Sequence, residues 1–289
     1  MFKRVIIPVD FSETSRSAFD LAALVAPHAS FELLHVVEPL DIAEPPVWAG
    51  EAPAAAQLRE HAIADARDTM MRFADRPSVL PSPPRAEVLV GPLPDTIVEY
   101  AKHMDGDLLC LTTHGRSGVS RWIMGSVAER LARVAPCPML VTRMPPVTQR
   151  LERIVVGVDL SEHSKRALSL AGRLCQAHGA GLDIVYAWTH PYAGAPASGY
   201  ADLIAAVGLE AKRHLVEFVR SAELPPGLSV RQLTPCGEPA AVLHDTLAEG
   251  PSDLVVLGTH GRRGFRHFVL GSVAETTLRH APCATLIVP

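Results

Sequence analysis

The sequence has few of the features that mark secreted, membrane or nucleic-acid-binding proteins. Its 289 residues include five cysteines, none of them in a C-x-x-C pair, which argues against a disulfide framework or a zinc ribbon. No apolar run approaches the roughly 18 residues of a membrane span, and the residues before the first strand do not resemble a signal peptide. The net charge of −4 lacks the basic excess of a nucleic-acid binder. We therefore expect free, mostly buried thiols in a cytoplasmic protein that binds neither membranes nor nucleic acid.

The sequence also lacks recognisable catalytic machinery. It contains no Walker lysine with an acidic magnesium ligand, and no recognisable pair of nucleophile and base. His114 and His260 have no second histidine or carboxylate at metal-ligand spacing, so we expect no metal site there. Fast hydrolysis of a bound nucleotide is therefore not expected.

The chain is a tandem duplication. Thr112-Thr-His-Gly115 is followed by nine residues and then Gly125-Ser126, and Gly258-Thr-His-Gly261 is followed by nine residues and then Gly271-Ser272. Both the histidines and the last glycines of the two copies lie 146 positions apart, and Asp10 and Asp159 lie 149 apart. We predict two domains, at residues 1–146 and 151–289, each long enough to bury a core of its own.

Short apolar runs alternate with helical patterns in both halves, which predicts an α/β fold with a largely parallel sheet. The expected strands lie at 4–10, 31–37, 85–90, 107–113, 138–142, 153–159, 182–188, 229–235, 253–259 and 284–288. The expected helices lie near 11–25, 58–76, 93–103, 127–134, 161–177, 200–221, 238–248 and 272–280. Two long segments, near 39–56 and 190–200, are expected to be loops.

The second glycine loop follows an apolar strand and precedes a helix, an arrangement that can hold an anion. Glycines let the backbone approach a ligand, and the free N–H groups of a helix start attract negative charge. Gly271-Ser272 followed by Glu275 also fits a capping box, with Ser272 as the N-cap and Glu275 three residues later. Both interpretations can hold together. The arginines within the loops could contact phosphate or simply be solvated; they are Arg116, Arg121, Arg262, Arg263 and Arg266.

The pattern G-x-x-G-x9-G-S resembles the nucleotide loop of the universal stress protein family, and the resemblance covers essentially the whole chain. It implies two tandem Rossmann-like domains of the adenine nucleotide alpha hydrolase-like type. Each would have a five-stranded parallel sheet in the order 3-2-1-4-5, with helices on both faces. It also implies ATP as the ligand, alone or with Mg²⁺, at the carboxyl ends of the first and fourth strands, where the strand order reverses.

The resemblance implies a set of nucleotide-binding residues in each half. In the second half they are Gly157, Val158, Asp159, Ala187, Leu257, Gly258, His260, Gly261, Arg262, Gly271, Ser272 and Val273. In the first half they are Pro8, Val9, Asp10, Val36, Thr112, Gly115, Gly125, Ser126 and Val127. Asp10 and Asp159 have two interpretations: a contact to the adenine side, or an acid that stabilises the following helix start. Thr112 replaces Gly258 of the second copy, and its side chain could block ribose or phosphate in the first half.

For function, the resemblance implies a cytoplasmic regulatory or protective module in which bound nucleotide biases conformation or the binding of an unidentified partner protein. Two alternatives from other classes stay open. One is a slow ATPase or nucleotidyl-transfer enzyme. The other is a nucleotide-free scaffold that binds partners through the loops around Trp48, Tyr192 and Tyr200.

The last strand of each half, at 138–142 and 284–288, is expected to be an edge with unpaired backbone groups. Family dimers pair these edges about a two-fold axis, and the linker at 144–150 would make that pairing intramolecular. We therefore expect a pseudo-symmetric dimer within one chain, with both nucleotide sites facing away from its centre. Association into a homodimer is possible but not required.

Overall fold

The computed structural model describes residues 1–38, 52–75, 80–112, 125–142, 150–189, 201–259, 261 and 270–289. The strands are β1 (Arg4–Pro8), β2 (Ser30–Val37), β3 (Arg85–Val90), β4 (Leu108–Thr112), β5 (Met139–Thr142), β6 (Arg153–Gly157), β7 (Gly181–Val185), β8 (Val230–Leu233), β9 (Leu254–Gly258) and β10 (Ala284–Val288). The helices are α1 (Glu13–Val25), α2 (Ala52–Ala74), α3 (Leu93–His103), α4 (Ser126–Val134), α5 (Glu162–His178), α6 (Ala201–Ser221), α7 (Pro239–Ala248) and α8 (Ser272–His280).

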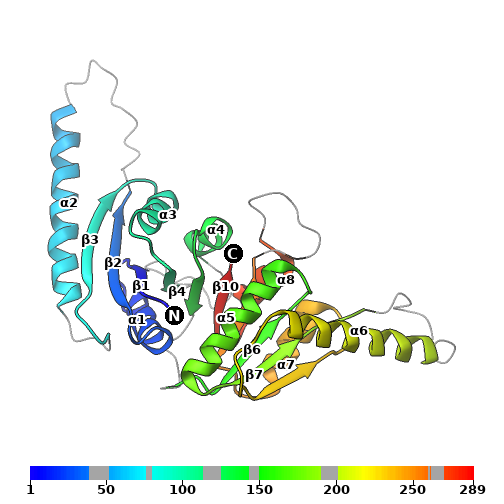
Figure 1. Cartoon of the computed structure of the whole chain (residues 1–289). Coiled ribbons are helices and arrows are strands. Elements are labelled where there is room, and N and C mark those ends of the chain that lie inside the picture. The colour runs from blue at the N-terminus through cyan, green and yellow to red at the C-terminus, as the bar shows by residue number, and fades with distance from the viewer. Residues whose placement is uncertain are drawn as a thin grey trace.

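All ten strands belong to one sheet, in the order β3-β2-β1-β4-β5-β10-β9-β6-β7-β8 (Figure 1). Every neighbouring pair within a half is parallel, and each half has the strand order that the family resemblance implies. The predicted α/β architecture is therefore confirmed. No helix in the described part of the chain combines the length and apolar character that crossing a membrane requires.

The central strands are apolar because both of their faces are covered. Val5, Ile6 and Ile7 of β1 are each 0% exposed, so consecutive side chains on opposite faces of the strand are all buried. This explains the continuous apolar runs in the sequence, since a half-exposed strand would alternate. The outermost strands, β3 and β8, consist mainly of exposed or half-buried residues.

The helices divide into two layers, and each layer shares one core across both halves. One core contains buried residues of α1, α2, α5 and α6, including Leu21, Phe73, Leu174 and Leu215. The core on the other face contains residues of α3, α4, α7 and α8. Because each core runs through both halves, the halves are joined by packing as well as by strand pairing.

The two half-sheets meet through β5 and β10, which pair antiparallel. Leu140 lies opposite Leu286, and the flanking pairs are Val141 with Thr285 and Met139 with Ile287. Leu140 and Leu286 are both 0% exposed. The edge pairing expected within one chain is therefore present, and it covers the backbone groups that an isolated half would expose.

Ion pairs on α4 and α8 reinforce the same joint. Arg279 of α8 lies 3.1 Å from Glu129 of α4 in the other half and 3.0 Å from Glu275 of its own helix. Arg133, at the position of Arg279 in the first half, pairs with Glu129 at 2.6 Å. These side chains are about one-third exposed, so solvent screens the attraction and each pair contributes little on its own.

Two element limits differ from those expected by three or more residues. α2 begins at Ala52, inside the segment expected to be a loop, because alanine favours helix and a proline near the start costs no hydrogen bond. β7 ends at Val185 rather than continuing to Trp188, which forms an isolated bridge with Cys236. The indole N–H of Trp188 donates to the Thr234 carbonyl at 2.8 Å.

We expect removal of residues 284–289 to expose the β5 edge and the surface that β10 covers. Unpaired strand edges template pairing with other chains, so the shortened protein should aggregate or dimerise. Light scattering and size-exclusion chromatography would measure this, with the intact chain as reference. A truncated protein that stays monomeric and melts at the temperature of the intact chain would refute the role of this pairing.

A histidine lies where α1 and α5 come together on one face of the joint. His178 is the last residue of α5, and its Nε2 atom is buried without a hydrogen-bond partner. Burial lowers the pKa of His178 below its ordinary value of 6.5, while the backbone of Val25, the last residue of α1, acts in the opposite direction. The folded protein therefore favours the neutral imidazole.

This burial predicts a pH dependence of stability. The unfolded chain binds the His178 proton at a higher pH than the folded protein does, so the free energy of unfolding should fall as the pH drops below 6.5. His178→Leu should reduce the loss of melting temperature between about pH 7.5 and 5.5. His244→Gln, at an exposed histidine, is the matched control. Equal pH dependence in wild type and His178→Leu would contradict this.

Candidate nucleotide site

The candidate site of the second half lies where β6 and β9 end side by side. The two strands are parallel neighbours, with Val156 opposite Val256, so their carboxyl ends lie at the same edge of the sheet. β7 continues the sheet on one side of them and β10 on the other, so the strand order reverses here. In open α/β sheets this is the place where ligands bind.

Helix α8 begins without a side-chain cap. Its N-cap is Gly271, with φ −61° and ψ 143°, and no side chain accepts a hydrogen bond there. The predicted capping box is therefore wrong, because Ser272 is the first helical residue rather than the N-cap. The Glu275 carboxylate pairs with Arg279. Without a side-chain cap, the first-turn N–H groups of α8 can serve an external acceptor.

The first half repeats this helix start. Gly125 is the N-cap of α4, with φ −62° and ψ 141°, and again no side chain caps the helix. Glu129 pairs with Arg133 and Arg279. The capping box predicted for Ser126 and Glu129 is wrong for the same reason.

A backbone hydrogen bond joins the residue after β9 to the N-cap of α8. The N–H of Gly271 donates to the Thr259 carbonyl at 2.8 Å, and the N–H of Thr259 donates to the Val288 carbonyl of β10 at 2.9 Å. Leu270, just before the helix, is 3% exposed. These hydrogen bonds hold the start of α8 beside the end of β9.

Gly261 brings this loop against the aspartate that follows β6. A Cβ atom built on Gly261 would lie 2.7 Å from Oδ2 of Asp159, closer than real Cβ contacts allow. A residue with a side chain would therefore displace the loop or the carboxylate. Gly261 and Asp159, two residues predicted for the site, therefore lie close together although they are about one hundred positions apart in the sequence.

Asp159 and Asp10 are held by the helix start that follows them. Oδ1 of Asp159 accepts hydrogen bonds from the Ser161 N–H at 3.1 Å and the Ser161 hydroxyl at 2.6 Å. Ser161 in turn caps α5 by accepting from the Ser164 N–H at 3.3 Å. Each aspartate therefore supports its helix start, which is one of its two interpretations, and the expected contact to the adenine side would be additional to that role.

In the first half, Oδ1 of Asp10 accepts from the N–H of Ser12 at 3.1 Å and from its hydroxyl at 2.5 Å. Ser12 is the N-cap of α1, and its hydroxyl oxygen accepts from the N–H of Ser15 at 3.1 Å. The residues between aspartate and serine, Phe11 and Leu160, have φ of 65° and 67°. Residues other than glycine rarely adopt this left-handed backbone conformation. Its presence at the same position in both halves shows that the two halves use the same sharp turn.

The second half needs a glycine at position 258 for packing. A Cβ atom on Gly258 would lie 3.0 Å from the backbone carbon and the Cβ of His163 at the start of α5. In the first half, Thr14 stands at the sequence position equivalent to His163, and Thr112 at the position equivalent to Gly258. Close packing of a strand end on a helix start thus accounts for Gly258 without a ligand.

The remaining predicted residues divide into a buried floor and a partly exposed rim. Val9, Val36, Val158 and Leu257 are each at most 6% exposed and form part of the cores. Half-buried positions are Pro8, Gly125, Val127, Gly157, Ala187, Gly271 and Val273, and Ser126 and Ser272 are exposed. A Cβ on Gly157 would meet Leu257 at 2.6 Å, so this glycine also serves packing.

Several predicted residues lie outside the described residues. They are Gly115, His260 and Arg262, together with His114, Arg116, Arg121, Arg263 and Arg266, and the loop residues Trp48, Tyr192 and Tyr200. Sequence reasoning missed two roles that the structure supplies: Ser161 as the holder of Asp159, and His163 as the neighbour of Gly258. The D-x-S spacing shared by both halves was an available signal for the first role.

The five cysteines are free thiols, as predicted, although Cys236 is exposed rather than buried. Burial raises the pKa of Cys175 and of Cys283 to about 12, and the acids Asp183 and Asp253 add to the effect. Burial likewise raises the pKa of Cys137 to about 12. These thiols stay protonated at neutral pH and are poor nucleophiles.

Comparison with known proteins agrees with this architecture. Universal stress protein Rv2005c of Mycobacterium tuberculosis is 32% identical over 203 residues, which cover 68% of this chain and 65% of that protein. The crystal structure of a universal stress protein from Archaeoglobus fulgidus matches with a TM-score of 0.62 at 18% identity, covering 99% of this chain and 97% of that one. Another structural neighbour is a universal stress protein in complex with cAMP, 28% identical over 48% of this chain and 96% of its own, with a TM-score of 0.33.

The sequence profile of the universal stress protein family matches this chain twice, at residues 1–143 and 150–289. The two matches coincide with the two halves of the sheet on either side of the β5–β10 joint. The chain therefore belongs to the universal stress protein family, with two copies of the family's fold in tandem.

Proposed function

We propose that this chain is a regulatory module of the stress response that binds an adenine nucleotide, ATP, at the carboxyl edge of its second half. One observation carries the proposal: α8 begins at a glycine N-cap with no side-chain cap, fastened beside the end of β9. That arrangement offers backbone N–H groups and the positive end of a helix dipole to an anion.

The phosphates would bind at the start of α8. The N–H groups of Ser272 and Val273 and the hydroxyl of Ser272 are donors in the first turn, and Gly271 lets phosphate oxygens approach the backbone. A phosphate here requires no cationic side chain for its first contacts, although a neighbouring arginine would strengthen them. Any Mg²⁺ would then be held chiefly by the phosphates.

The nucleoside would lie across the end of β6. Asp159 is fixed by Ser161, so its carboxylate is positioned before a ligand arrives. A carboxylate can accept hydrogen bonds from a ribose hydroxyl or the adenine amino group. Val158 and Leu257 supply an apolar floor beneath this edge, and Ala187 lies beside them after β7.

The first half has the same framework and is proposed as a second, weaker site. Asp10 is held by Ser12, and α4 starts at Gly125 without a side-chain cap. Thr112 stands where the second half has Gly258, and Pro8 stands where it has Gly157. Since Gly258 is also explained by packing on His163, the direct effect of Thr112 on a ligand needs its own test.

Regulation is favoured over turnover because the described residues of the site contain donors and a positioned acid but no recognisable pair of nucleophile and base. Free thiols throughout the chain suit a reducing compartment such as the cytoplasm. Arg279, in the last turn of the same helix α8, contacts Glu129 of the other half. Occupancy of the site could therefore bias the joint between the halves and, through it, the binding of a partner protein.

We expect Gly271→Val to weaken ATP binding at least about tenfold, because a side chain at the N-cap obstructs the approach of phosphate to the backbone. Calorimetric titration of the folded variant would measure this. Gly125→Val, the matched substitution in α4, should leave the stronger site intact. Unchanged affinity in folded Gly271→Val would refute the proposed phosphate site, and mass spectrometry of denatured wild-type protein would identify any nucleotide carried through purification.

We expect Thr112→Gly to raise the affinity or stoichiometry of the first site, and Gly258→Thr to lower ATP binding at the second. Gly258→Thr should also destabilise the ligand-free protein by about 1–3 kcal/mol, because its side chain overpacks against His163. Chemical denaturation without ATP measures this packing effect separately from titration. Two equal sites in wild type, with neither substitution changing binding, would show that this position does not set affinity.

A further inference from the structure

A second polar cluster occurs once in each half, at the amino ends of the strands and thus at the edge opposite each half's candidate nucleotide site. An arginine begins the first strand, and the next strand carries an acid in register with an arginine of the outer strand. The residues are Arg4, Glu32 and Arg85 in the first half and Arg153, Asp183 and Arg231 in the second. Each half therefore places one carboxylate between two arginines.

In the second half this cluster is closed, meaning that both arginines donate hydrogen bonds to the carboxylate. Asp183 is 3% exposed; its Oδ2 accepts from Nε of Arg153 at 2.6 Å and its Oδ1 from Nε of Arg231 at 2.6 Å. Burial alone would raise the pKa of Asp183, but hydrogen bonds from both arginines hold it below its ordinary value. Arg153 also donates to the Gly250 carbonyl and the Ser252 hydroxyl. This carboxylate is fully paired with guanidinium groups.

In the first half the equivalent cluster is open, meaning that neither arginine donates a close hydrogen bond to the carboxylate of Glu32. The side chain of Glu32 is 3% exposed, and among the residues that the structure describes its ion pair is with Nε of Arg4, at 3.9 Å. That Nε is buried without a hydrogen-bond partner, while Nη1 of Arg4 donates to the Met104 carbonyl. Glu32 and Arg85 form no ion pair, although the strand register places them opposite each other. A buried carboxylate is thus left with a tyrosine hydroxyl, that of Tyr100, and one distant cation.

Two substitutions between the halves open the cluster. Tyr100 of α3 stands where α7 has Thr246, and its ring lies beside the acid. Glu87 of β3 stands where β8 has Leu233, since each is two residues beyond the arginine of its outer strand. The first half therefore has an aromatic ring and an extra carboxylate that the second half lacks.

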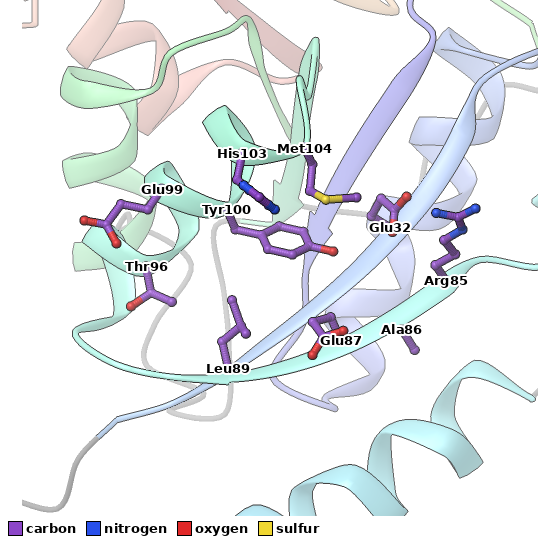
Figure 2. A pocket seen from close by; sticks show the side chains of 10 residues that line it. All are labelled: Glu32, Arg85, Ala86, Glu87, Leu89, Thr96, Glu99, Tyr100, His103 and Met104. Carbon is purple, nitrogen blue, oxygen red and sulfur yellow. The ribbon is translucent and has the colours of Figure 1, made fainter.

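Glu32, Glu87 and Tyr100 line a groove of about 750 Å³ between α3 and the strands β2 and β3 (Figure 2). Figure 2 shows the Tyr100 ring projecting from α3 toward Glu32 and Glu87, with Leu89 beside it and Glu99 further along α3. The volume is within the range of small-molecule sites. Carboxylates thus lie at both ends of an aromatic and aliphatic middle section.

Glu32 and Glu87 place negative charge at one end of the groove, beside the Tyr100 hydroxyl. After burial, the main causes that raise the pKa of Tyr100 to about 12 are the charges of Glu32 and Glu87, and Arg4 only partly opposes them. A cation beside the ring would be attracted by these carboxylates and by the face of the aromatic ring.

We propose that this groove binds an aliphatic diamine or polyamine. One ammonium group lies against Glu32 and Glu87, the methylene chain packs on Tyr100 and Leu89, and a second ammonium group lies toward Glu99. The second half supports the choice of cation, because there the equivalent carboxylate binds two guanidinium groups directly. This site is independent of the proposed nucleotide site.

The same residues disfavour other ligands. No group of three or more His, Cys, Asp or Glu side chains in the described part of the chain is arranged to hold a metal ion, so the carboxylates are too dispersed for a divalent cation. An anion would face three carboxylates. A neutral ligand would leave Glu32 without a close cationic partner, which costs free energy in a buried position.

The test is calorimetric titration of the full chain with spermidine and with diaminobutane, and with butanediol as the uncharged analogue. We expect both amines to bind and butanediol not to bind, and we expect added salt to weaken the amines. Absence of amine binding at millimolar concentration, or equal binding of butanediol, would overturn the proposal.

Substitutions at exposed positions locate the site without disturbing the core. Glu87→Gln should weaken spermidine binding about tenfold, whereas Asp245→Asn, with the same charge change on an exposed residue of α7, should change it less than about twofold. Arg85→Gln should strengthen binding, because Arg85 lines the groove and its positive charge repels an ammonium group, and Arg220→Gln, far along α6, should not. Equal weakening by Glu87→Gln and Asp245→Asn would indicate unspecific attraction and refute the site. Weaker binding in Arg85→Gln would equally refute it.

Discussion

The antiparallel pairing of β5 with β10 is the constraint on which the rest of the molecule depends. It converts two five-stranded sheets, each with a vulnerable apolar edge, into one ten-stranded sheet whose remaining edges, β3 and β8, are mostly polar or exposed. It also reverses the strand direction between the halves. The carboxyl edge of one half therefore lies on the same side of the sheet as the amino edge of the other, and the two candidate nucleotide sites lie on opposite sides.

Much of this fold could be predicted from the sequence because its main signals are periodic and local. The 146-residue offset identifies the duplication, continuous apolar runs identify doubly covered strands, and the glycine loops mark the strand ends at which ligands bind. The helix caps were less certain, since both glycine and serine are good N-cap residues and spacing alone does not distinguish Gly271 from Ser272. The contact between Gly258 and His163 joins residues 95 positions apart, so no local pattern could indicate it.

The duplication explains why two nearly equivalent backbones carry different chemistry. At the amino edge of the second half, two arginines donate hydrogen bonds to Asp183 and neutralise its charge. In the first half, Tyr100 and Glu87 replace the neutral Thr246 and Leu233, and Glu32 lacks a close cation. A buried carboxylate without a close partner is costly. Such a residue is easier to understand if a ligand supplies the missing charge than if the site serves only the fold.

Communication between the halves must depend on packing more than on charge. The ion pair between Arg279 and Glu129 is about one-third exposed, and such pairs typically contribute less than about 1 kcal/mol. Burying a single large apolar side chain such as Met139 or Ile287 contributes about 1.5–3 kcal/mol, and these two residues pair across the joint in the core that also contains α4 and α8. A nucleotide at the start of α8 would therefore influence the other half mainly by shifting how α8 and β10 pack in the shared core. If a nucleotide binds there, we expect the ion pair to orient α8 against α4 and the core that contains both helices to supply most of the coupling energy.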